Sequence, residues 1–195
     1  MKHMVIKGWK KEIYTIPNLL SLFRLLLIPV YVLIYLHAQK PSDYYLAAGI
    51  LAVSCLTDLL DGKIARRFNM ISTIGKILDP LADKATQFTL IVCLALKHKV
   101  LRYLVALFVA KESFQLIAGC INLRKGRMLK GALFSGKVCT TILFISLIAL
   151  VTLPELNPNI INIIAAVDAV FMLAAFVDYI IAYFFVDNKF QAVEQ

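Results

Sequence analysis

The sequence predicts an all-α membrane protein with six transmembrane helices and an N-terminal amphipathic interfacial helix. Of its 195 residues, 61% are hydrophobic, whereas a soluble domain has roughly 45–50% apolar residues. The mean hydropathy is +0.79, and the apolar residues gather in six long runs. A span takes about 20 residues, so six spans fill the chain. Each is expected to be a helix, because a lone strand cannot satisfy its backbone polar groups in hydrocarbon.

The interfacial helix is expected over residues 1–14, because its apolar residues share one arc and its lysines lie opposite. The apolar residues are Val5, Ile6, Trp9 and Ile13, and the lysines are Lys7, Lys10 and Lys11. The six spans are expected near residues 18–37, 44–64, 74–96, 101–123, 132–153 and 159–186. They form one domain over 15–187, followed by a C-terminal tail over 188–195.

The cysteines argue against a zinc site or a disulfide framework. They lie singly in separate apolar runs, with no C-x-x-C pair, at Cys55, Cys93, Cys120 and Cys139. We expect them to be small packing residues.

The charge of the connections predicts the orientation. Most lysines and arginines outside the spans lie in the N-terminal segment and in the connections on the same side of the membrane. The positive-inside rule then places the N-terminus in the cytoplasm. The net charge of +9 therefore indicates contact with anionic lipid headgroups or phosphorylated substrates rather than with nucleic acid.

Four aspartates lie where the second and third spans meet on the cytoplasmic side. Asp58 and Asp61 share a face of one helix, and Asp79 and Asp83 are stacked four residues apart on the next. Converging carboxylates at a membrane need a compensating positive charge. An oxygen-only ligand set favours Mg²⁺ or Mn²⁺ over zinc or copper, and four such side chains could hold two ions.

The neighbouring residues favour a phosphoryl-transfer site. Gly62 and Gly75 leave space on the aspartate faces for a pyrophosphate group. Arg66 lies one helical turn beyond Gly62 and is suited to bidentate binding of phosphate oxygens. Metal ions in such sites stabilise charge on the attacking and leaving oxygens. The alternative is a set of ion pairs that hold the helix ends at the interface.

These residues resemble the signature of the CDP-alcohol phosphatidyltransferase family, D-x2-D-G-x2-A-R-x8-G-x3-D-x3-D. The signature is complete here as Asp58, Asp61, Gly62, Ala65, Arg66, Gly75, Asp79 and Asp83. The resemblance implies that an alcohol attacks a CDP-linked lipid, usually CDP-diacylglycerol, and that CMP leaves. It also implies that Asp58, Asp61 and Asp79 bind the metal, and that Asp83 is the base and a further candidate ligand. Gly62, Ala65, Arg66 and Gly75 would surround the cytidine diphosphate.

The first span carries a second likeness, because residues 16–30 resemble the first span of bacterial phosphatidylglycerolphosphate synthases and of cardiolipin synthases of this family. Asn18, Ser21 and Arg24 recur at about one helical turn. They are therefore expected to face the aspartates, with Asn18 near the cytidine diphosphate. For Asn18, a helix cap after Pro17 is an equal alternative.

The acceptor pocket departs from that of relatives that use glycerol-phosphate. Gly119 and Cys139 stand where such relatives carry an arginine and a lysine. The remaining candidates for binding an acceptor are Lys111 and Lys137 within apolar runs, and Arg124 and Arg127 in the basic connection. Glu112 could pair with either lysine. Asp168 and Asp178 in the last span have no assigned role, although local polar groups could cap Asp168.

The sequence therefore predicts a metal-dependent phosphatidyltransferase with a glycerol-type acceptor, most simply phosphatidylglycerolphosphate synthase, which uses glycerol-3-phosphate. A cardiolipin synthase that uses phosphatidylglycerol is the close alternative, and a divalent-cation transporter is a distant one. We expect an integral protein of a bacterial cell membrane with its active site facing the cytoplasm. The resemblance also suggests a homodimer.

Overall fold

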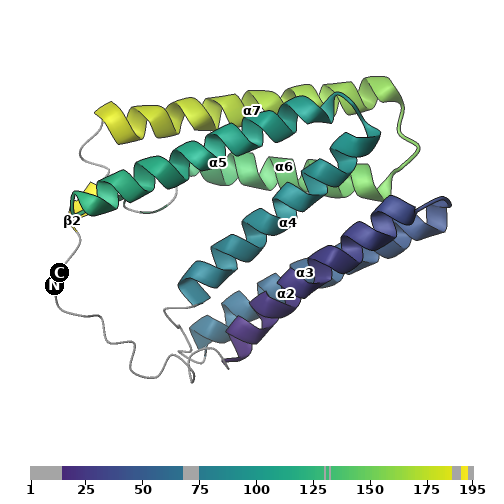
Figure 1. Ribbon diagram of the computed structural model, residues 1–195, viewed down its shortest axis with the longest axis horizontal. Helices are drawn as coiled ribbons and strands as arrows, with labels where there is room; N and C mark the ends of the chain where they lie inside the picture. Colours follow the sequence, from purple (N-terminus) through teal and green to yellow (C-terminus); the bar gives the residue numbers. More distant parts are fainter. Residues whose placement is uncertain (1–14, 68–74, 130, 132, 186–189, 193–195) are drawn as a thin grey trace. The chain divides into compact units, whose positions relative to one another are not determined.

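The computed structural model describes residues 15–67, 75–129, 131, 133–185 and 190–192. The described chain contains the helices α2 (Ile16–His37), α3 (Pro41–Arg67), α4 (Gly75–Lys97), α5 (Leu101–Arg124), α6 (Phe134–Thr152) and α7 (Pro158–Phe185), and the strands β1 (Arg127–Leu129) and β2 (Phe190–Ala192). Figure 1 shows them along the chain. Each predicted span coincides with one helix to within three residues at either end. The expected interfacial helix over 1–14 lies outside the described residues.

The chain forms two compact units, Met1–Cys93 and Leu94–Gln195. In the first unit, α2 and α3 pack along each other as an antiparallel pair. The turn between them is closed by Asp43, whose carboxylate accepts bonds of 3.0 Å from the backbone N–H groups of Gln39 and Lys40. The Tyr35 ring lies between those of Tyr31 and Tyr44, at centroid distances of 5.5 and 5.7 Å. These aromatic contacts hold the turn end of the pair together.

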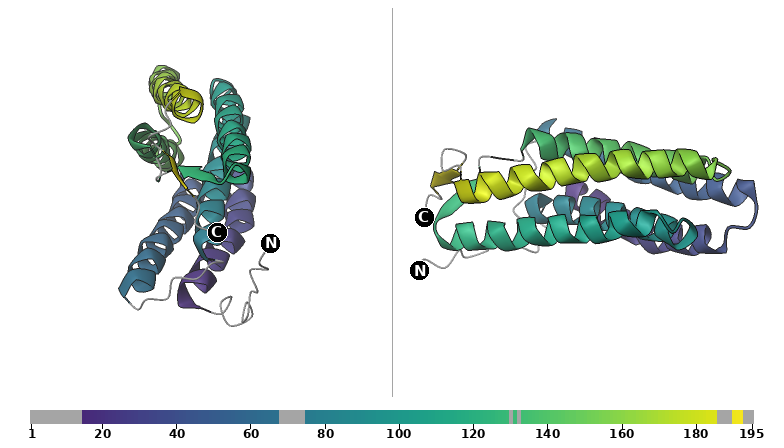
Figure 2. Two further views of the ribbon diagram at one scale, coloured as in Figure 1. Left: turned by 90° about the vertical axis from the view of Figure 1, so that its left-hand side faces the viewer. Right: turned by 90° about the horizontal axis from the view of Figure 1, so that it is seen from above.

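In the second unit, α7 packs against both α5 and α6. Figures 1 and 2 show α6 and α7 side by side. Asn157 precedes Pro158 at the start of α7, and its side-chain oxygen accepts the N–H of Asn159 at 2.9 Å, as expected of an N-cap followed by proline. Between α5 and α7, the Phe114 ring meets those of Phe176 and Tyr183 edge-on.

Gly126 ends α5 with a positive φ of 71°, the left-handed conformation that favours glycine after a helix. Strand β1 follows at once and pairs antiparallel with β2, with Met128 opposite Gln191. Part of the expected tail over 188–195 is thus a strand that holds the connection between α5 and α6. The sequence analysis did not predict either strand.

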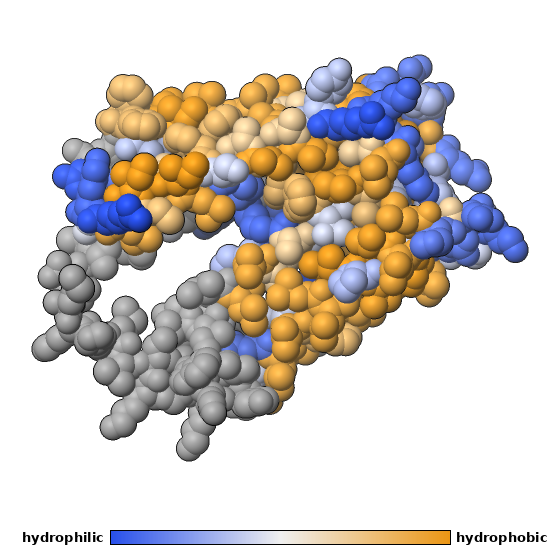
Figure 3. Space-filling view, in the orientation of Figure 1, coloured by the Kyte–Doolittle hydropathy of each residue, from blue (hydrophilic) through white to orange (hydrophobic). Residues whose placement is uncertain are grey.

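The surface has the character expected of a membrane protein. Large apolar side chains stay exposed along every helix, for example Leu26, Leu56, Leu96, Leu116, Ile145 and Val170. Figure 3 shows apolar residues over the visible sides of the helices and hydrophilic residues toward their ends. Four described helices are long and apolar enough to cross a membrane, namely α2 from Asn18, α5, α6 and α7. Helices α3 and α4, which carry the motif acids, are not among these four. No disulfide joins the four cysteines, all of which lie in the described part of the chain.

Candidate functional site

The signature residues lie on two successive helices. Asp58, Asp61, Gly62, Ala65 and Arg66 belong to the C-terminal part of α3, where the structure does not describe side chains. Gly75 is the first residue of α4 and is buried, and Asp79 and Asp83 follow on the same helix. The predicted placement of the motif at the end of one helix and the start of the next is therefore confirmed.

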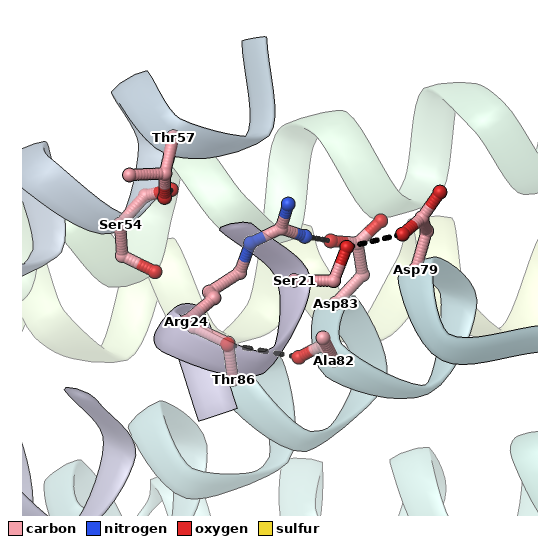
Figure 4. A network of polar contacts seen from close by, with 8 residues as sticks. All are labelled: Ser21, Arg24, Ser54, Thr57, Asp79, Ala82, Asp83 and Thr86. Carbon is pink, nitrogen blue, oxygen red and sulfur yellow. Dashed lines mark hydrogen bonds and ion pairs between the residues drawn. The ribbon is translucent and has the colours of Figure 1, made fainter. Parts of the chain in front are cut away.

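Helix α2 contacts both described carboxylates of the motif, as Figure 4 shows. The Ser21 hydroxyl donates a hydrogen bond to Oδ1 of Asp79. The Arg24 guanidinium donates from Nη1 to Oδ1 of Asp83 and forms an ion pair with it. Ser21 and Arg24 are three residues apart and Asp79 and Asp83 four apart, so one helical turn of α2 matches one turn of α4.

The two members of the ion pair differ in exposure to solvent. The Arg24 side chain is 2% exposed, whereas the Asp83 side chain is 49% exposed. A buried guanidinium is costly unless it is paired and hydrogen-bonded, so Asp83 supports the position of Arg24. The Asp83 carboxylate itself remains half-exposed.

A narrow crevice adjoins Arg24 within the first unit. Its lining combines apolar side chains with hydroxyl groups and comes from three helices: Arg24, Leu27, Ile28 and Tyr31 of α2, Ile50, Leu51 and Ser54 of α3, and Thr86, Thr89 and Leu90 of α4. Thr86 donates its hydroxyl hydrogen bond to the carbonyl oxygen of Ala82 at 2.9 Å. The Thr57 hydroxyl likewise donates a hydrogen bond to the carbonyl oxygen of Ser54 at 2.7 Å. These bonds to the helix backbone keep the hydroxyl groups satisfied in an apolar interior.

Asn18 lies inside α2 and is 3% exposed. The N-cap residue of α2 is Thr15, so the interpretation of Asn18 as a helix cap is wrong. Asn18 is in the turn of α2 that precedes Ser21. Its side-chain amide carries both donor and acceptor groups, so it adds a buried polar group to the same end of α2.

The donor chemistry of the site fits a hard divalent cation. Asp79 and Asp83 offer carboxylate oxygens from one face of α4, and the sequence places Asp58 and Asp61 on the preceding helix. Such oxygens are the ligands of Mg²⁺ and Mn²⁺. Among side chains that the structure describes, no three acidic, histidine or cysteine groups meet as a metal site. Asp58 and Asp61 lie outside that description.

The acceptor candidates all belong to the second unit. Lys111 in α5 is 2% exposed and donates to Oε1 of Glu112 at 2.6 Å. The pairing of Glu112 is thereby settled in favour of Lys111. Lys137 in α6 is exposed, as are Arg124 at the end of α5 and Arg127 in β1. Lys111 is thus a cation within the helix bundle, and the other three are surface cations.

The two unassigned acids of α7 differ in environment. Asp168 is 2% exposed and accepts a hydrogen bond of 3.0 Å from the Ser146 hydroxyl of α6. The polar group that caps it belongs to the neighbouring helix and satisfies one carboxylate oxygen, Oδ1. Asp178 is exposed. Asp168 therefore joins α6 to α7 through a part-buried hydrogen bond.

Sequence reasoning missed the importance of Gly136 for packing. A Cβ atom at this position would lie 2.6 Å from the Tyr179 hydroxyl oxygen, so the end of the Tyr179 side chain packs against the α6 backbone there. Gly136 precedes Lys137, one of the acceptor candidates. The sequence did contain a signal, because an isolated glycine within a helix often has a packing reason. The sequence did not show which residue of α7 packs against it.

Comparisons with known proteins agree with the motif. A family model described as CDP-alcohol phosphatidyltransferase matches residues 14–181. The CDP-diacylglycerol–glycerol-3-phosphate 3-phosphatidyltransferase of Aquifex aeolicus is 33% identical over 169 residues, which cover 84% of this chain and 93% of the relative.

Two relatives carry another name. The cardiolipin synthase (CMP-forming) of Streptomyces coelicolor is 35% identical over 131 residues, which cover 66% of this chain and 61% of the relative. The cardiolipin synthase (CMP-forming) / mitochondrial hydrolase fusion protein of Schizosaccharomyces pombe is 38% identical over 105 residues, which cover 53% of this chain and 17% of the relative. The chain therefore spans less than two thirds of the length of these two relatives.

Proposed function

Because the chain belongs to the CDP-alcohol phosphatidyltransferase family, we propose that it transfers the phosphatidyl group of CDP-diacylglycerol to glycerol-3-phosphate. The observation that carries this choice of acceptor is the match to the Aquifex aeolicus enzyme, which covers 93% of that relative and is named for this reaction. The reaction class is supported by the complete motif and by the contacts that α2 makes with Asp79 and Asp83.

In the proposed reaction, the acceptor hydroxyl oxygen forms a bond to the phosphorus that carries diacylglycerol. The bond between this phosphorus and the oxygen shared with the cytidylyl phosphate breaks, and CMP leaves with that oxygen. Asp83 accepts the hydroxyl proton, which suits a half-exposed carboxylate that a substrate can reach. Asp83 is also a candidate metal ligand.

The other motif residues have binding roles in this proposal. Asp58, Asp61 and Asp79 hold one or two Mg²⁺ or Mn²⁺ ions, and the bound metal supplies positive charge for the diphosphate. Gly62, Ala65, Arg66 and Gly75 surround the cytidine diphosphate, with Asn18 beside them on α2. Ser21 orients the Asp79 carboxylate through its hydrogen bond.

The acceptor phosphate is assigned to cations of the second unit. Lys111 is the strongest candidate, because a lysine inside an apolar helix is costly and usually serves a partner or a pathway. Lys137, Arg124 and Arg127 are surface cations that can attract an anionic acceptor. The uncharged residues Gly119 and Cys139 make phosphatidylglycerol the acceptor to test beside glycerol-3-phosphate.

In the membrane, all six helices α2–α7 are proposed to span the bilayer, with the N-terminus and the motif at the cytoplasmic face of the cell membrane. The apolar surface of the helices and the basic connections support this arrangement. A homodimer is proposed by resemblance to the family.

The test supplies purified full-length protein in detergent with CDP-diacylglycerol, Mg²⁺ and one acceptor at a time, and follows CMP release and the lipid product. The expected result is CMP release with glycerol-3-phosphate and formation of phosphatidylglycerolphosphate. Release with phosphatidylglycerol but not with glycerol-3-phosphate would identify a cardiolipin synthase instead. The Asp58→Asn variant is the control for release that does not depend on the motif.

A further inference from the structure

The connection between α4 and α5 gathers positive charge at the end of α4 that lies away from the motif. Lys97, Lys99 and Arg102 are exposed there, and Tyr103 beside them is 80% exposed. We call these four residues the basic turn, which belongs to the second unit. The sequence has no acidic residue within residues 84–111, so this whole segment carries charge of one sign.

Hydrogen bonds hold the basic turn in shape. The His98 carbonyl accepts the N–H of Leu101 at 3.0 Å. The Lys99 carbonyl accepts that of Arg102 at 3.2 Å, so α5 begins directly after the turn. Nε of Arg102 also donates to the carbonyl oxygen of Ala95 at 3.4 Å, one of the last four carbonyls of α4, which have no partner within a helix. This bond uses one of the five guanidinium N–H groups and keeps the cation at the turn.

The orientation of the chain does not explain these cations. In the proposed topology the α4–α5 connection faces away from the cytoplasm, where lysine and arginine are normally few. The other two connections on that side differ from it. Lys40 is followed by Asp43 between α2 and α3, and Glu155 is the only charged residue between α6 and α7. A net positive charge on this side is therefore found in the basic turn alone, and it calls for a partner.

We propose that the basic turn binds the phosphate headgroup of an anionic lipid at the membrane face opposite the motif. Lysine binds phosphate oxygens as a point charge, and arginine binds them through a fork of N–H groups. Tyr103 adds an amphipathic ring, the kind of side chain that lies at headgroup level. Each cation near an anionic lipid surface contributes roughly a fivefold gain in affinity. The inference goes beyond the proposed reaction, which assigns no role to these residues.

The surface beside the basic turn favours a lipid over a free phosphate ion. Leu96, next to Lys97, is 60% exposed. Ala106 and Ala110 follow Tyr103 along one face of α5 and are exposed as well. An acyl chain attached to a bound headgroup would therefore have apolar side chains to lie against.

The experiment reads lipid binding at the turn itself. The full-length protein carries Trp9→Phe and Tyr103→Trp, so that its only tryptophan lies in the basic turn, and it is reconstituted in phosphatidylcholine vesicles. The tryptophan fluorescence is quenched either with brominated phosphatidic acid or with brominated phosphatidylcholine of the same acyl chains. Phosphatidic acid is neither donor nor acceptor in the proposed reaction. We expect it to be preferred over phosphatidylcholine by at least about tenfold, because several cations act together.

Lys97→Gln/Lys99→Gln in this background should lower the preference by at least about fivefold, because two positive charges are removed. Lys97→Arg/Lys99→Arg keeps both charges and should keep the preference. Lys125→Gln is the matched control: it removes an exposed cation at the far end of α5, about 33 Å from the tryptophan along the helix. This variant should leave the preference unchanged.

Equal quenching by the two lipids would overturn the proposal. A loss of preference in Lys125→Gln as large as in the double glutamine variant would do so too, because the selectivity would then not belong to the turn. Absence of quenching by either lipid would show that protein covers the turn. Loss of the preference in sodium phosphate, but not in sodium chloride of equal ionic strength, would show a site for free phosphate instead. None of these readouts uses CMP release, so a failure here is distinct from a failure of the proposed function.

Discussion

Tyr179 of α7 packs its ring directly against the backbone of Gly136 in the first turn of α6. A Cβ atom at position 136 would lie 2.6 Å from the tyrosine hydroxyl oxygen and 2.9 Å from a ring carbon. Tyr179 is only 5% exposed, so the ring has little room to move. The Tyr179 ring therefore occupies the space that a side chain at position 136 would need.

Gly136→Ala is therefore expected to destabilise the protein by about 1–3 kcal/mol, the usual cost of overpacking a filled site. Thermal unfolding in detergent measures the effect. The double variant Gly136→Ala/Tyr179→Phe should recover part of the loss, because the closest atom is removed. Gly49→Ala is the control: nothing described lies within 4 Å of its Cβ position. A Gly136→Ala protein as stable as this control would contradict the prediction.

Asp83→Asn should lower the rate of CMP release by roughly 10²–10⁴-fold, the range expected when a general base is lost. Binding of CMP should persist, because the amide keeps the size of the carboxylate and the nucleotide is assigned to other residues. Initial-rate assays and equilibrium binding of radiolabelled CMP test the two parts. Asp178→Asn, at an exposed acid of α7, is the matched control and should retain wild-type turnover. Undiminished turnover by Asp83→Asn would exclude this residue as the base.

Lys111→Met should raise the KM for glycerol-3-phosphate by about tenfold or more if the buried ammonium binds the acceptor phosphate, since a charge-assisted contact would be lost. Folding should survive, because the Glu112 side chain that loses its partner is 18% exposed, whereas that of Lys111 is 3% exposed, and an ionised group costs less where solvent reaches it. Steady-state kinetics over a range of acceptor concentrations measure the change.

Glu112→Gln gives the contrasting result for this pair. It leaves the Lys111 ammonium, 2% exposed, without its carboxylate and should cost about 1–3 kcal/mol of stability. If Lys111→Met leaves the acceptor KM unchanged, Lys111 has a purely structural role.

His98, in the connection between α4 and α5, should make stability depend on pH. Burial, with a smaller contribution from Lys97, lowers the pKa of this imidazole below its ordinary value. The folded state thus favours the neutral ring, so the unfolded state binds more protons. The contribution of His98 to stability is full above the unfolded pKa of about 6.5 and is lost as pH falls through the folded value. Melting temperatures between pH 8 and pH 5, at roughly half-unit steps, should fall more steeply for the wild type than for His98→Gln. Parallel curves would count against this assignment.

Removal of β2 should loosen the basic connection between α5 and α6. Strand β1 pairs with β2 through Arg127 opposite Ala192, and locally ordered backbone resists proteolysis. A chain that ends at residue 189 should therefore be cut by trypsin after Arg124, Lys125 or Arg127 faster than the full chain. A chain that ends at residue 192 keeps β2 and serves as the control. Equal cleavage rates would show that the strand pair does not protect the connection.

Local sequence signals were sufficient for the helices and for the placement of the motif. Hydropathy marks a helix along its whole length, and each predicted span matched a helix to within three residues. Helix ends depend on single residues and were harder to predict. Asparagine is a common N-cap residue, but the N-cap of α2 is Thr15 and not Asn18. The pairing of β1 with β2 was not predictable, because three-residue strands from distant parts of the chain have no periodicity to read.

The sequence alone determined the positions of the six helices, the carboxylates at the junction of α3 and α4, and the family that these residues indicate. These features depend on the spacing of residues within one segment of the chain, because the geometry of a helix fixes which face each position occupies. Only the tertiary structure decided the partners. It paired Arg24 with Asp83 and Ser21 with Asp79, gave Glu112 to Lys111, and set Tyr179 against Gly136. Apart from the adjacent pair Lys111 and Glu112, these partners come from different helices, so their contacts depend on how the helices pack and rotate.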